Sequence, residues 1–148
     1  YQNPTIKPDL RILVMGGEGN GRLLPAGPLR QPLAEAKNWA DAVIDTPVAE
    51  VVPPLPDTNK AYTAFSGIAR PQKFFQTLRD QGYTLIATHA FPDHHDFTIE
   101  ELVALGDGPL ITTEKDWMRL PPTWQGKIST LKIRAVLPES TKELIRNI

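Results

Sequence analysis

Two histidines lie between two aspartates at Asp93–Asp96, in the segment FPDHHDF. A histidine beside carboxylates is the usual composition of a group that moves or orients a proton near neutral pH. The segment follows an apolar run that predicts a buried strand, and ligands of α/β sheets bind at the carboxyl ends of strands. A polar loop with solvated side chains that cap the next helix is the simpler alternative. The segment alone leaves both interpretations open.

A metal site is weakly supported by the same segment. Adjacent histidine side chains diverge, and His89 is the only other histidine in the sequence, so a cluster of three ligands is not indicated. The DHH-type phosphoesterases share the Asp-His-His triplet, but their further metal-binding motifs are absent from this sequence. We therefore predict no metal ligands within the chain.

A second polar cluster, Thr112–Asp116, lies at the end of the predicted strand 109–113, PLITT. A helix cap with an exposed ion pair is the commoner outcome for such residues. They are equally compatible with the border of a crevice shared with Asp93–Asp96, because both clusters lie at the carboxyl ends of neighbouring predicted strands.

The glycine-rich stretch Gly16–Arg30 is not a nucleotide-binding loop. Gly16 and Gly21 have the spacing of a Walker A motif, but Arg22 and Leu23 stand where the lysine and the Mg²⁺-binding hydroxyl are needed. A tight turn followed by a proline-ordered connection is the simplest interpretation. The functional alternative is a loop whose backbone N–H groups hold an anion together with Arg22 and Arg30.

Apolar runs and helix signals alternate along the chain, which predicts an α/β fold with a mostly parallel sheet. The proline-rich segment 47–59 is expected to be an extended linker with edge-strand character. Strands are predicted at 10–15, 41–46, 60–67, 83–91, 109–113 and 129–136, and helices at 32–40, 70–82, 97–108 and 138–148.

Composition limits the classes of function. The chain has 148 residues, a net charge of −1 and no cysteine. It is long enough for one domain with a substantial core, and it carries no basic footprint for nucleic acid. No stretch reaches the roughly 18 to 20 apolar residues of a transmembrane helix. The chain begins with Tyr1 rather than Met, which suggests a fragment of a longer protein.

Three segments together resemble one family. GNGRLLPAGPLR, then AFSGIARPQKFF with FPDHHDF, then TTEKDW occur in this order and at this spacing in the tetraacyldisaccharide 4'-kinases, the lipid A 4'-kinases of Gram-negative bacteria. The resemblance covers nearly the whole chain, and the combination is far more specific than any one segment. The opening YQNP is similar to the end of the family's Asp-Asp-Gly-[Phe/aliphatic]-Gln motif.

The resemblance implies a membrane-associated P-loop kinase that transfers the γ-phosphate of ATP, with Mg²⁺, to the 4'-hydroxyl of a tetraacyldisaccharide 1-phosphate. It implies a P-loop-kinase-like protein of two domains. Residues 1–46 would be the tail of the nucleotide-binding domain, 47–59 the linker, and 60–148 a small Rossmann-like α/β C-terminal domain.

The resemblance also suggests site residues. His94, with Asp93, matches the family's catalytic Asp-His pair and would act with an aspartate outside this chain. His95 is the less favoured of the two histidines. Substrate or phosphate contacts carry over to Asn20, Gly21, Arg22 and Arg30, and positions near the active site to Gln2, Thr113, Glu114 and Lys115. Gln31 stands where the family is expected to have Glu.

The resemblance implies lipid A biosynthesis at the cytoplasmic face of the bacterial inner membrane, with membrane attachment through a part outside this chain. The implied partners are the lipid A disaccharide precursor, ATP and the membrane surface. Because the sequence contains no Walker A motif, we expect the chain by itself to be inactive. A stand-alone, non-catalytic binding module derived from the kinase is the alternative.

Overall fold

The computed structural model describes residues 7–15, 22–27, 29–45 and 48–148. The chain divides into two compact units, Tyr1–Glu50 with Ala135–Ile148, and Val51–Arg134. In chain order the elements are β1 (Ile12–Val14), α1 (Leu33–Trp39), β2 (Ala42–Ile44), β3 (Val48–Val52), β4 (Ala61–Ser66), α2 (Pro71–Asp80), β5 (Thr84–Ala90), α3 (Ile99–Ala104), β6 (Leu110–Thr113), α4 (Glu114–Trp117), α5 (Pro122–Gln125), β7 (Ser129–Val136) and α6 (Glu139–Arg146).

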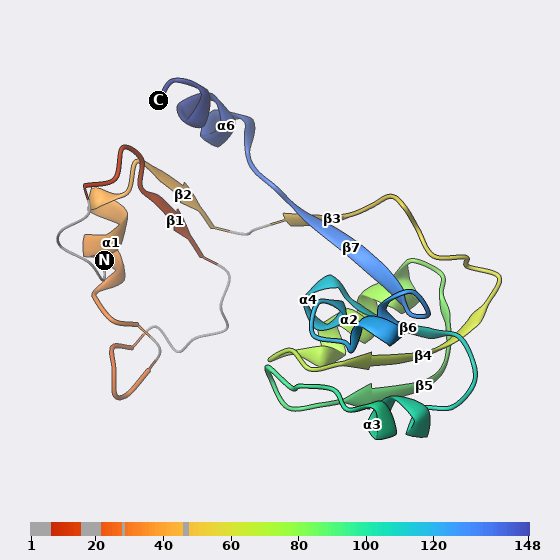
Figure 1. The fold of residues 1–148 in the computed structure, drawn as a ribbon. Helices are drawn as coiled ribbons and strands as arrows, with labels where there is room; N and C mark the ends of the chain where they lie inside the picture. Colours follow the sequence, from red (N-terminus) through yellow and green to blue (C-terminus); the bar gives the residue numbers. More distant parts are fainter. Residues whose placement is uncertain (1–6, 16–21, 28, 46–47) are drawn as a thin grey trace. The chain divides into compact units, whose positions relative to one another are not determined.

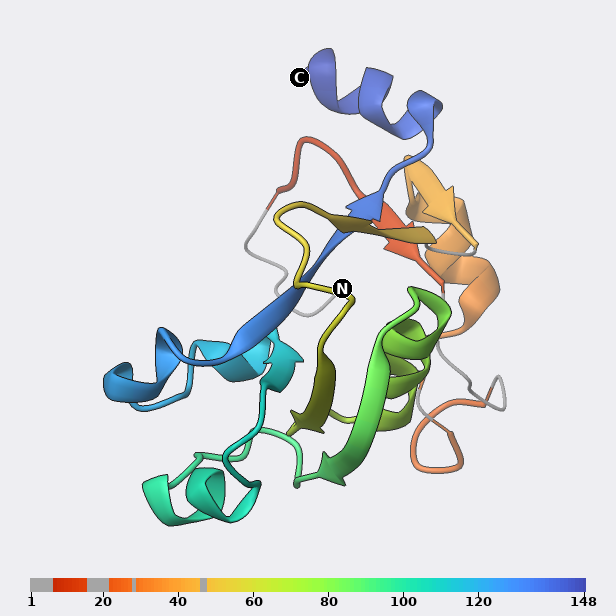
Figure 2. The same cartoon turned by 90° about the vertical axis from the view of Figure 1, so that its right-hand side faces the viewer.

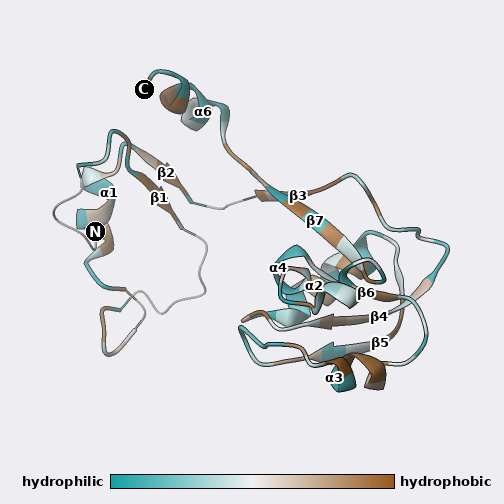
Figure 3. Ribbon diagram, in the orientation of Figure 1, coloured by the Kyte–Doolittle hydropathy of each residue, from teal (hydrophilic) through white to brown (hydrophobic). Residues whose placement is uncertain are grey.

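The first unit contains the parallel pair β1–β2, in which Ile12 lies opposite Ala42. The sequence of β1 is entirely apolar, as its colour in Figure 3 shows. Where the pair begins, the backbone N–H and the Nε of Arg11 donate to Oδ2 of Asp41, at 2.8 and 3.2 Å. The hydrogen bonds from Arg11 lower the pKa of the Asp41 carboxyl.

The second unit contains most of a five-stranded sheet with the order β3-β7-β6-β4-β5. The pairs β4–β5, β4–β6 and β6–β7 are all parallel, and the arrows of β4 and β5 point the same way in Figure 1. Parallel neighbours require crossover connections. Helix α2 lies in the connection from β4 to β5, and α4 and α5 lie in the connection from β6 to β7. The α/β class predicted from the alternation of strands and helices is therefore confirmed.

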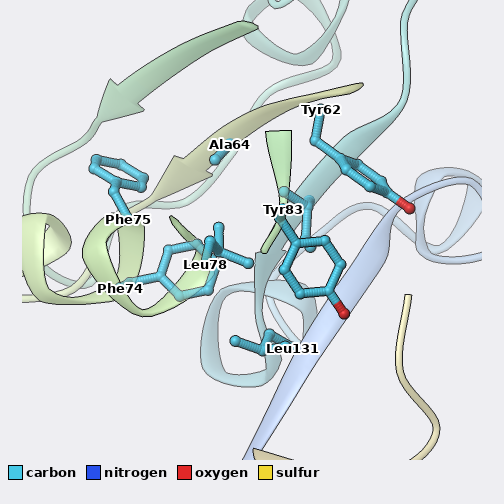
Figure 4. Packing of buried hydrophobic residues seen from close by; sticks show 8 residues of the cluster. Tyr62, Ala64, Phe74, Phe75, Leu78, Tyr83 and Leu131 are labelled. Carbon is cyan, nitrogen blue, oxygen red and sulfur yellow. The ribbon is translucent and has the colours of Figure 1, made fainter. Parts of the chain in front are cut away.

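One face of the sheet packs against α2, which lies beside β4 and β5 in Figure 2. The helix begins with Pro71 in its first turn and ends before Gly82, whose φ of +83° favours glycine. The core on this side is apolar and closely packed (Figure 4). It consists of Tyr62, Ala64, Phe74, Phe75, Leu78, Tyr83, Ile111 and Leu131.

A second buried cluster includes residues of β4, α3 and β6 and of the segments after α4 and α5. Its members are Phe65, Phe97, Leu102, Leu110, Leu120 and Ile128. Helix α3 begins at the predicted capping box: the Thr98 hydroxyl accepts from the N–H of Glu101, and the Glu101 carboxylate accepts from the N–H of Thr98. The short helix α5 was not predicted, and α4 was suggested only through its cap.

The proline-rich segment is attached to the first core by two tyrosines. The hydroxyl of Tyr62 donates to the carbonyl of Asp57, and that of Tyr83 to the carbonyl of Pro56, both at 3.1 Å. Burial raises the pKa of the Tyr83 hydroxyl. The segment also contains β3, at one edge of the sheet, which agrees with the edge-strand character expected from its sequence.

Candidate functional site at the carboxyl ends of β4 and β6

The order of the parallel strands creates a switch point between β4 and β6. The chain passes from β4 to β5 on one side of β4, then crosses back to β6 on the other side. At such a point the connections diverge and leave a crevice outside the carboxyl ends of the strands, where α/β proteins bind ligands. β4 ends at Ser66 and β6 ends at Thr113, so the segments after Ser66, Ala90 and Thr113 are those that can build a site.

Asp116 joins the ends of these two strands. Its side chain is fully buried, and its Oδ2 accepts hydrogen bonds from the hydroxyls of Ser66 at 2.7 Å and Thr113 at 2.8 Å. The Thr113 hydroxyl in turn accepts from the N–H of Asp116 and caps α4. The cap is the one that the sequence suggested. The expected exposure of the cluster is wrong for Asp116, because Ser66, 50 residues away in sequence, supplies a buried partner.

The loop after β5 is held against the end of β4 by backbone contacts. The N–H of Phe91 donates to the carbonyl of Ser66 at 2.9 Å, and that of His94 to the carbonyl of Gly67 at 3.0 Å. Within the loop, the N–H of His95 donates to the carbonyl of Pro92 at 3.2 Å. His94 has a φ of +65°, an uncommon conformation for a residue with a side chain. This turn sends the two adjacent histidine side chains into different surroundings.

Gly67 permits this approach because it has no side chain. A Cβ at this position would lie 3.0 Å from the Pro92 carbonyl oxygen and 3.1 Å from the Cβ of His95. We therefore expect Gly67→Ala to displace the loop and to cost about 1 to 3 kcal/mol of the free energy of unfolding, measured by urea denaturation. Gly126→Ala is the matched control, because a Cβ at Gly126 meets nothing within 4 Å. Equal stability of the two variants would contradict the prediction.

The side chain of His95 is built into the structure of the loop. Its ring stacks on Phe91 at 4.9 Å between centroids and meets the edge of Phe97 at 5.1 Å. Its Nε2 lies 2.9 Å from Oε2 of Glu101, the carboxylate of the capping box. The side chain of His95 therefore has a structural role: it packs on the aromatic rings of the loop and links the loop to α3 through Glu101.

The hydrogen bond from the backbone N–H of Thr98, followed by that from His95, lowers the pKa of Glu101 below its ordinary value of 4.5. A carboxyl with a lowered pKa in the folded state stabilises the fold above its unfolded pKa, and this contribution is lost as the pH falls through the folded pKa. We expect Glu101→Gln to destabilise the chain near neutral pH, and the difference from wild type to shrink below about pH 4. Urea denaturation at both pH values measures this. Glu100→Gln, one residue earlier on α3, should show no such convergence.

His94 lies in a different environment, among charged side chains. Its side chain is 67% exposed, and its Nε2 lies 3.8 Å from Oδ2 of Asp93. Its Nδ1 lies 2.6 Å from Nη2 of Arg119, which follows α4. The other oxygen of Asp93, Oδ1, is 3.4 Å from Nζ of Lys115. Asp93, His94, Lys115 and Arg119 thus form one cluster, which we call the switch-point cluster.

The switch-point cluster contains three of the residues suggested from sequence, namely Asp93, His94 and Lys115. Arg119 was missed. The available signal was its spacing, four residues after Lys115, which places both on one side of a helical turn that directly follows a strand. The contact between Lys115 and Asp93 shows that the two polar segments meet at this edge of the sheet.

The remaining suggested residues are not members of the switch-point cluster as defined above. Glu114 pairs with Lys132 at 3.7 Å and lines a groove of about 470 Å³ together with residues of α4, β7 and the proline-rich segment. Arg22 and Arg30 belong to the first unit and are exposed. The suggested residues Gln2, Asn20 and Gly21 lie outside the described residues.

Within the described ranges, no three His, Asp or Glu side chains come together in a group that could hold a metal ion.

None of the helices described by the structure is both long enough and apolar enough to cross a membrane.

Comparisons with known proteins identify the family. The family model described as tetraacyldisaccharide-1-P 4'-kinase matches residues 48–148. The tetraacyldisaccharide 4'-kinase of Phenylobacterium zucineum is 33% identical over 94% of this chain and 53% of its own length. That of Rhodospirillum centenum is 39% identical over 90% of this chain and 48% of its own length. The chain thus spans about half the length of the curated relatives it matches.

A solved structure agrees with these matches. The crystal structure of the apo form of LpxK from Aquifex aeolicus, described as a complex with ATP, matches with a TM-score of 0.67 and 27% sequence identity. The match covers 95% of this chain and 53% of that chain. A parallel sheet with charged side chains at its switch point is the arrangement in which α/β proteins bind ligands. The chain belongs to the tetraacyldisaccharide 4'-kinase family, as the resemblance of its motifs predicted.

Proposed function

We propose that this chain is part of a lipid A biosynthesis kinase that transfers the γ-phosphate of ATP to the 4'-hydroxyl of a tetraacyldisaccharide 1-phosphate. The observation that carries the proposal is the family match over residues 48–148, which includes the whole switch-point cluster. Relatives that are tetraacyldisaccharide 4'-kinases are 33% to 39% identical over most of the chain.

The switch-point cluster suits the acceptor side of such a reaction. Phosphoryl transfer to an alcohol needs a group that orients or deprotonates the hydroxyl, together with positive charge near the transferred phosphate. In our proposal His94, supported by Asp93, contacts the acceptor. Lys115 and Arg119 contribute positive charge beside it, and Lys115 is held by Asp93 at 3.4 Å. Thr113 acts indirectly, because its side chain caps α4.

The nucleotide side of the site is proposed to come from elsewhere. The sequence contains no G-x-x-x-x-G-K-[ST] motif, and the described residues offer no group of three carboxylates or histidines for a metal ion. We therefore propose that the phosphate-binding loop and most ligands of Mg²⁺ belong to sequence outside these 148 residues. We propose that phosphate or sugar groups of the substrate are contacted by Asn20, Gly21, Arg22 and Arg30. Gln2 is proposed to lie near the active site.

The proposed domain organisation follows the same reasoning. Residues 1–46 are the tail of the nucleotide-binding domain, 47–59 the linker and 60–148 the smaller C-terminal domain. The substrate carries acyl chains and resides in a membrane, so we place the reaction at the cytoplasmic face of the bacterial inner membrane. Membrane attachment is proposed to reside in a part outside this chain.

The test is a phosphotransfer assay with radiolabelled ATP and tetraacyldisaccharide 1-phosphate in detergent micelles. The genomic sequence upstream of Tyr1 is read first. We expect an in-frame continuation that encodes a Walker A motif, transfer by the longer product, and none by the chain alone. Transfer by the chain alone would overturn the proposal that its nucleotide site lies outside it. A start codon at or near Tyr1 would favour the non-catalytic binding module.

A further inference from the structure

The guanidinium of Arg119 has an unusual set of partners. Its Nη2 contacts Nδ1 of His94 at 2.6 Å. Its Nη1 is buried, and within the described part of the chain it has no hydrogen-bond partner. No carboxylate among the described residues forms an ion pair with it. The imidazole of His94 is therefore the main polar contact of a permanently charged group.

This contact determines which nitrogen of His94 carries the proton. A guanidinium has only donors and stays protonated in proteins, so Nδ1 must accept the hydrogen bond through its lone pair. A neutral imidazole has one N–H, and with Nδ1 accepting, that N–H is at Nε2. We propose that Arg119 is a positioning residue that holds His94 in the Nε2–H tautomer, so that His94 acts as a hydrogen-bond donor and not as a general base.

The fold holds both partners at the end of a single strand. The backbone N–H of Arg119 donates to the carbonyl of Asp116 at 2.9 Å, and the Asp116 carboxylate is bound by Ser66. On the other side, the N–H of His94 donates to the carbonyl of Gly67. Ser66 and Gly67 are consecutive, so the two loops that carry His94 and Arg119 are anchored at neighbouring residues. The contact between the two side chains is thus built into the fold of the switch point.

The tautomer of His94 limits its role in the proposed reaction, on which this part of the inference rests. A general base must offer a lone pair to the acceptor hydroxyl. The nitrogen of His94 that faces away from Arg119 is Nε2, and it carries the hydrogen. It lies 3.8 Å from Oδ2 of Asp93 and belongs to a side chain that is 67% exposed. His94 can therefore orient an oxygen or a carboxylate of the reacting groups through Nε2–H. The proton of the hydroxyl then passes to a carboxylate outside this chain, the aspartate that the family resemblance implies.

The first experiment reads the tautomer directly and does not depend on kinase activity. Ring nitrogen shifts of His94 are measured by NMR in the ¹⁵N-labelled chain at about pH 8, where an unperturbed histidine is neutral. We expect Nδ1 to be fully unprotonated in the wild type and to move toward an average of both tautomers in Arg119→Met. Arg79→Met, an exposed arginine on α2, should leave the shifts unchanged. Protonated Nδ1 in the wild type, or unchanged shifts in Arg119→Met, would overturn the proposal.

The second experiment separates a donor from a base in the longer, active enzyme. Glutamine can place an amide N–H near the position of Nε2 but cannot accept a proton from the substrate. If His94 is a donor, His94→Gln should retain at least 10-fold more kcat than His94→Ala. Arg119→Met should lower kcat about 10-fold with KM little changed, and Arg119→Lys should restore part of it.

The outcomes distinguish the two proposals. Equal inactivity of His94→Gln and His94→Ala would overturn the donor role of His94, even if the enzyme is a kinase. Absence of phosphotransfer in the wild-type enzyme would overturn the proposed function and leave the NMR result to decide on the Arg119–His94 contact. If Arg119→Met does not fold, Arg119→Lys decides the NMR arm, because an ammonium placed differently should also alter the balance of tautomers. Shifts in Arg119→Lys identical to wild type, with identical kcat, would then overturn the positioning role.

Discussion

His94→Ala in the longer enzyme is expected to reduce kcat at least about 100-fold, the usual contribution of a positioned group that donates or transfers a proton. His94 is exposed and carries no packing role, since its ring contacts only Asp93 and Arg119 among the described polar groups. Its removal should therefore leave the free energy of unfolding nearly unchanged. Steady-state phosphotransfer and urea denaturation measure the two effects.

His95→Ala is the matched control, one residue away in the same loop. It removes a ring that stacks on Phe91 and binds Glu101. We expect a loss of about 1 to 3 kcal/mol in unfolding free energy with a much smaller loss of kcat in the protein that remains folded. Equal losses of kcat in the two variants would refute the assignment of the catalytic role to His94.

The regular elements could be predicted because their signals are local. The apolar run that forms β5 (84–90) lies between two segments with helix signals. The start of α3 is marked by the capping box of Thr98 and Glu101. Helices α4 and α5 have four residues each, which is too short for a helical period to show in the sequence. The position of α4 also depends on the hydrogen bond between Asp116 and Ser66, which are 50 residues apart in sequence.

The candidate site could be predicted in part for the same reason. Two polar segments after strands were enough to indicate where Asp93, His94 and Lys115 lie, because carboxyl ends of parallel strands meet at one edge. The burial of Asp116 could not be predicted, since EKDW has the composition of a solvated turn and the partner Ser66 is 50 residues away. The difference between His94 and His95 depends on the φ of +65° at His94. The residue types of this loop do not specify that backbone conformation.

Asp116→Ala is expected to have the largest effect on stability. The change leaves the hydroxyl of Ser66, which is completely buried, without its acceptor, and it removes the partner of the Thr113 hydroxyl. An unpaired buried group costs about 1 to 3 kcal/mol, and a cavity adds to it. We expect a total loss of about 3 to 4 kcal/mol in unfolding free energy, which is a large part of the stability of a typical domain.

Asp116→Asn keeps a hydrogen-bond acceptor at this position and removes only the charge of the side chain. The amide oxygen can still accept from both hydroxyls, while the NH₂ group takes the place of Oδ1, which has no hydrogen-bond partner within the described residues. We expect Asp116→Asn to lose clearly less stability than Asp116→Ala. Asp80 is an exposed carboxylate on α2 that accepts a hydrogen bond from Gln76. Its replacement in Asp80→Ala should cost less than about 0.5 kcal/mol.

A double-mutant cycle measures the energetic coupling between Ser66 and Asp116. If Asp116 acts through Ser66, the loss in Ser66→Ala and the loss in Asp116→Ala should not add, because each removes the same hydrogen bond. Additive losses would show that Asp116 stabilises the fold by another route. We expect the change in kcat to follow the change in stability. Asp116→Ala loosens the turn that carries Arg119, so its effect on kcat should resemble that of Arg119→Met. Asp116→Asn should retain most of the activity.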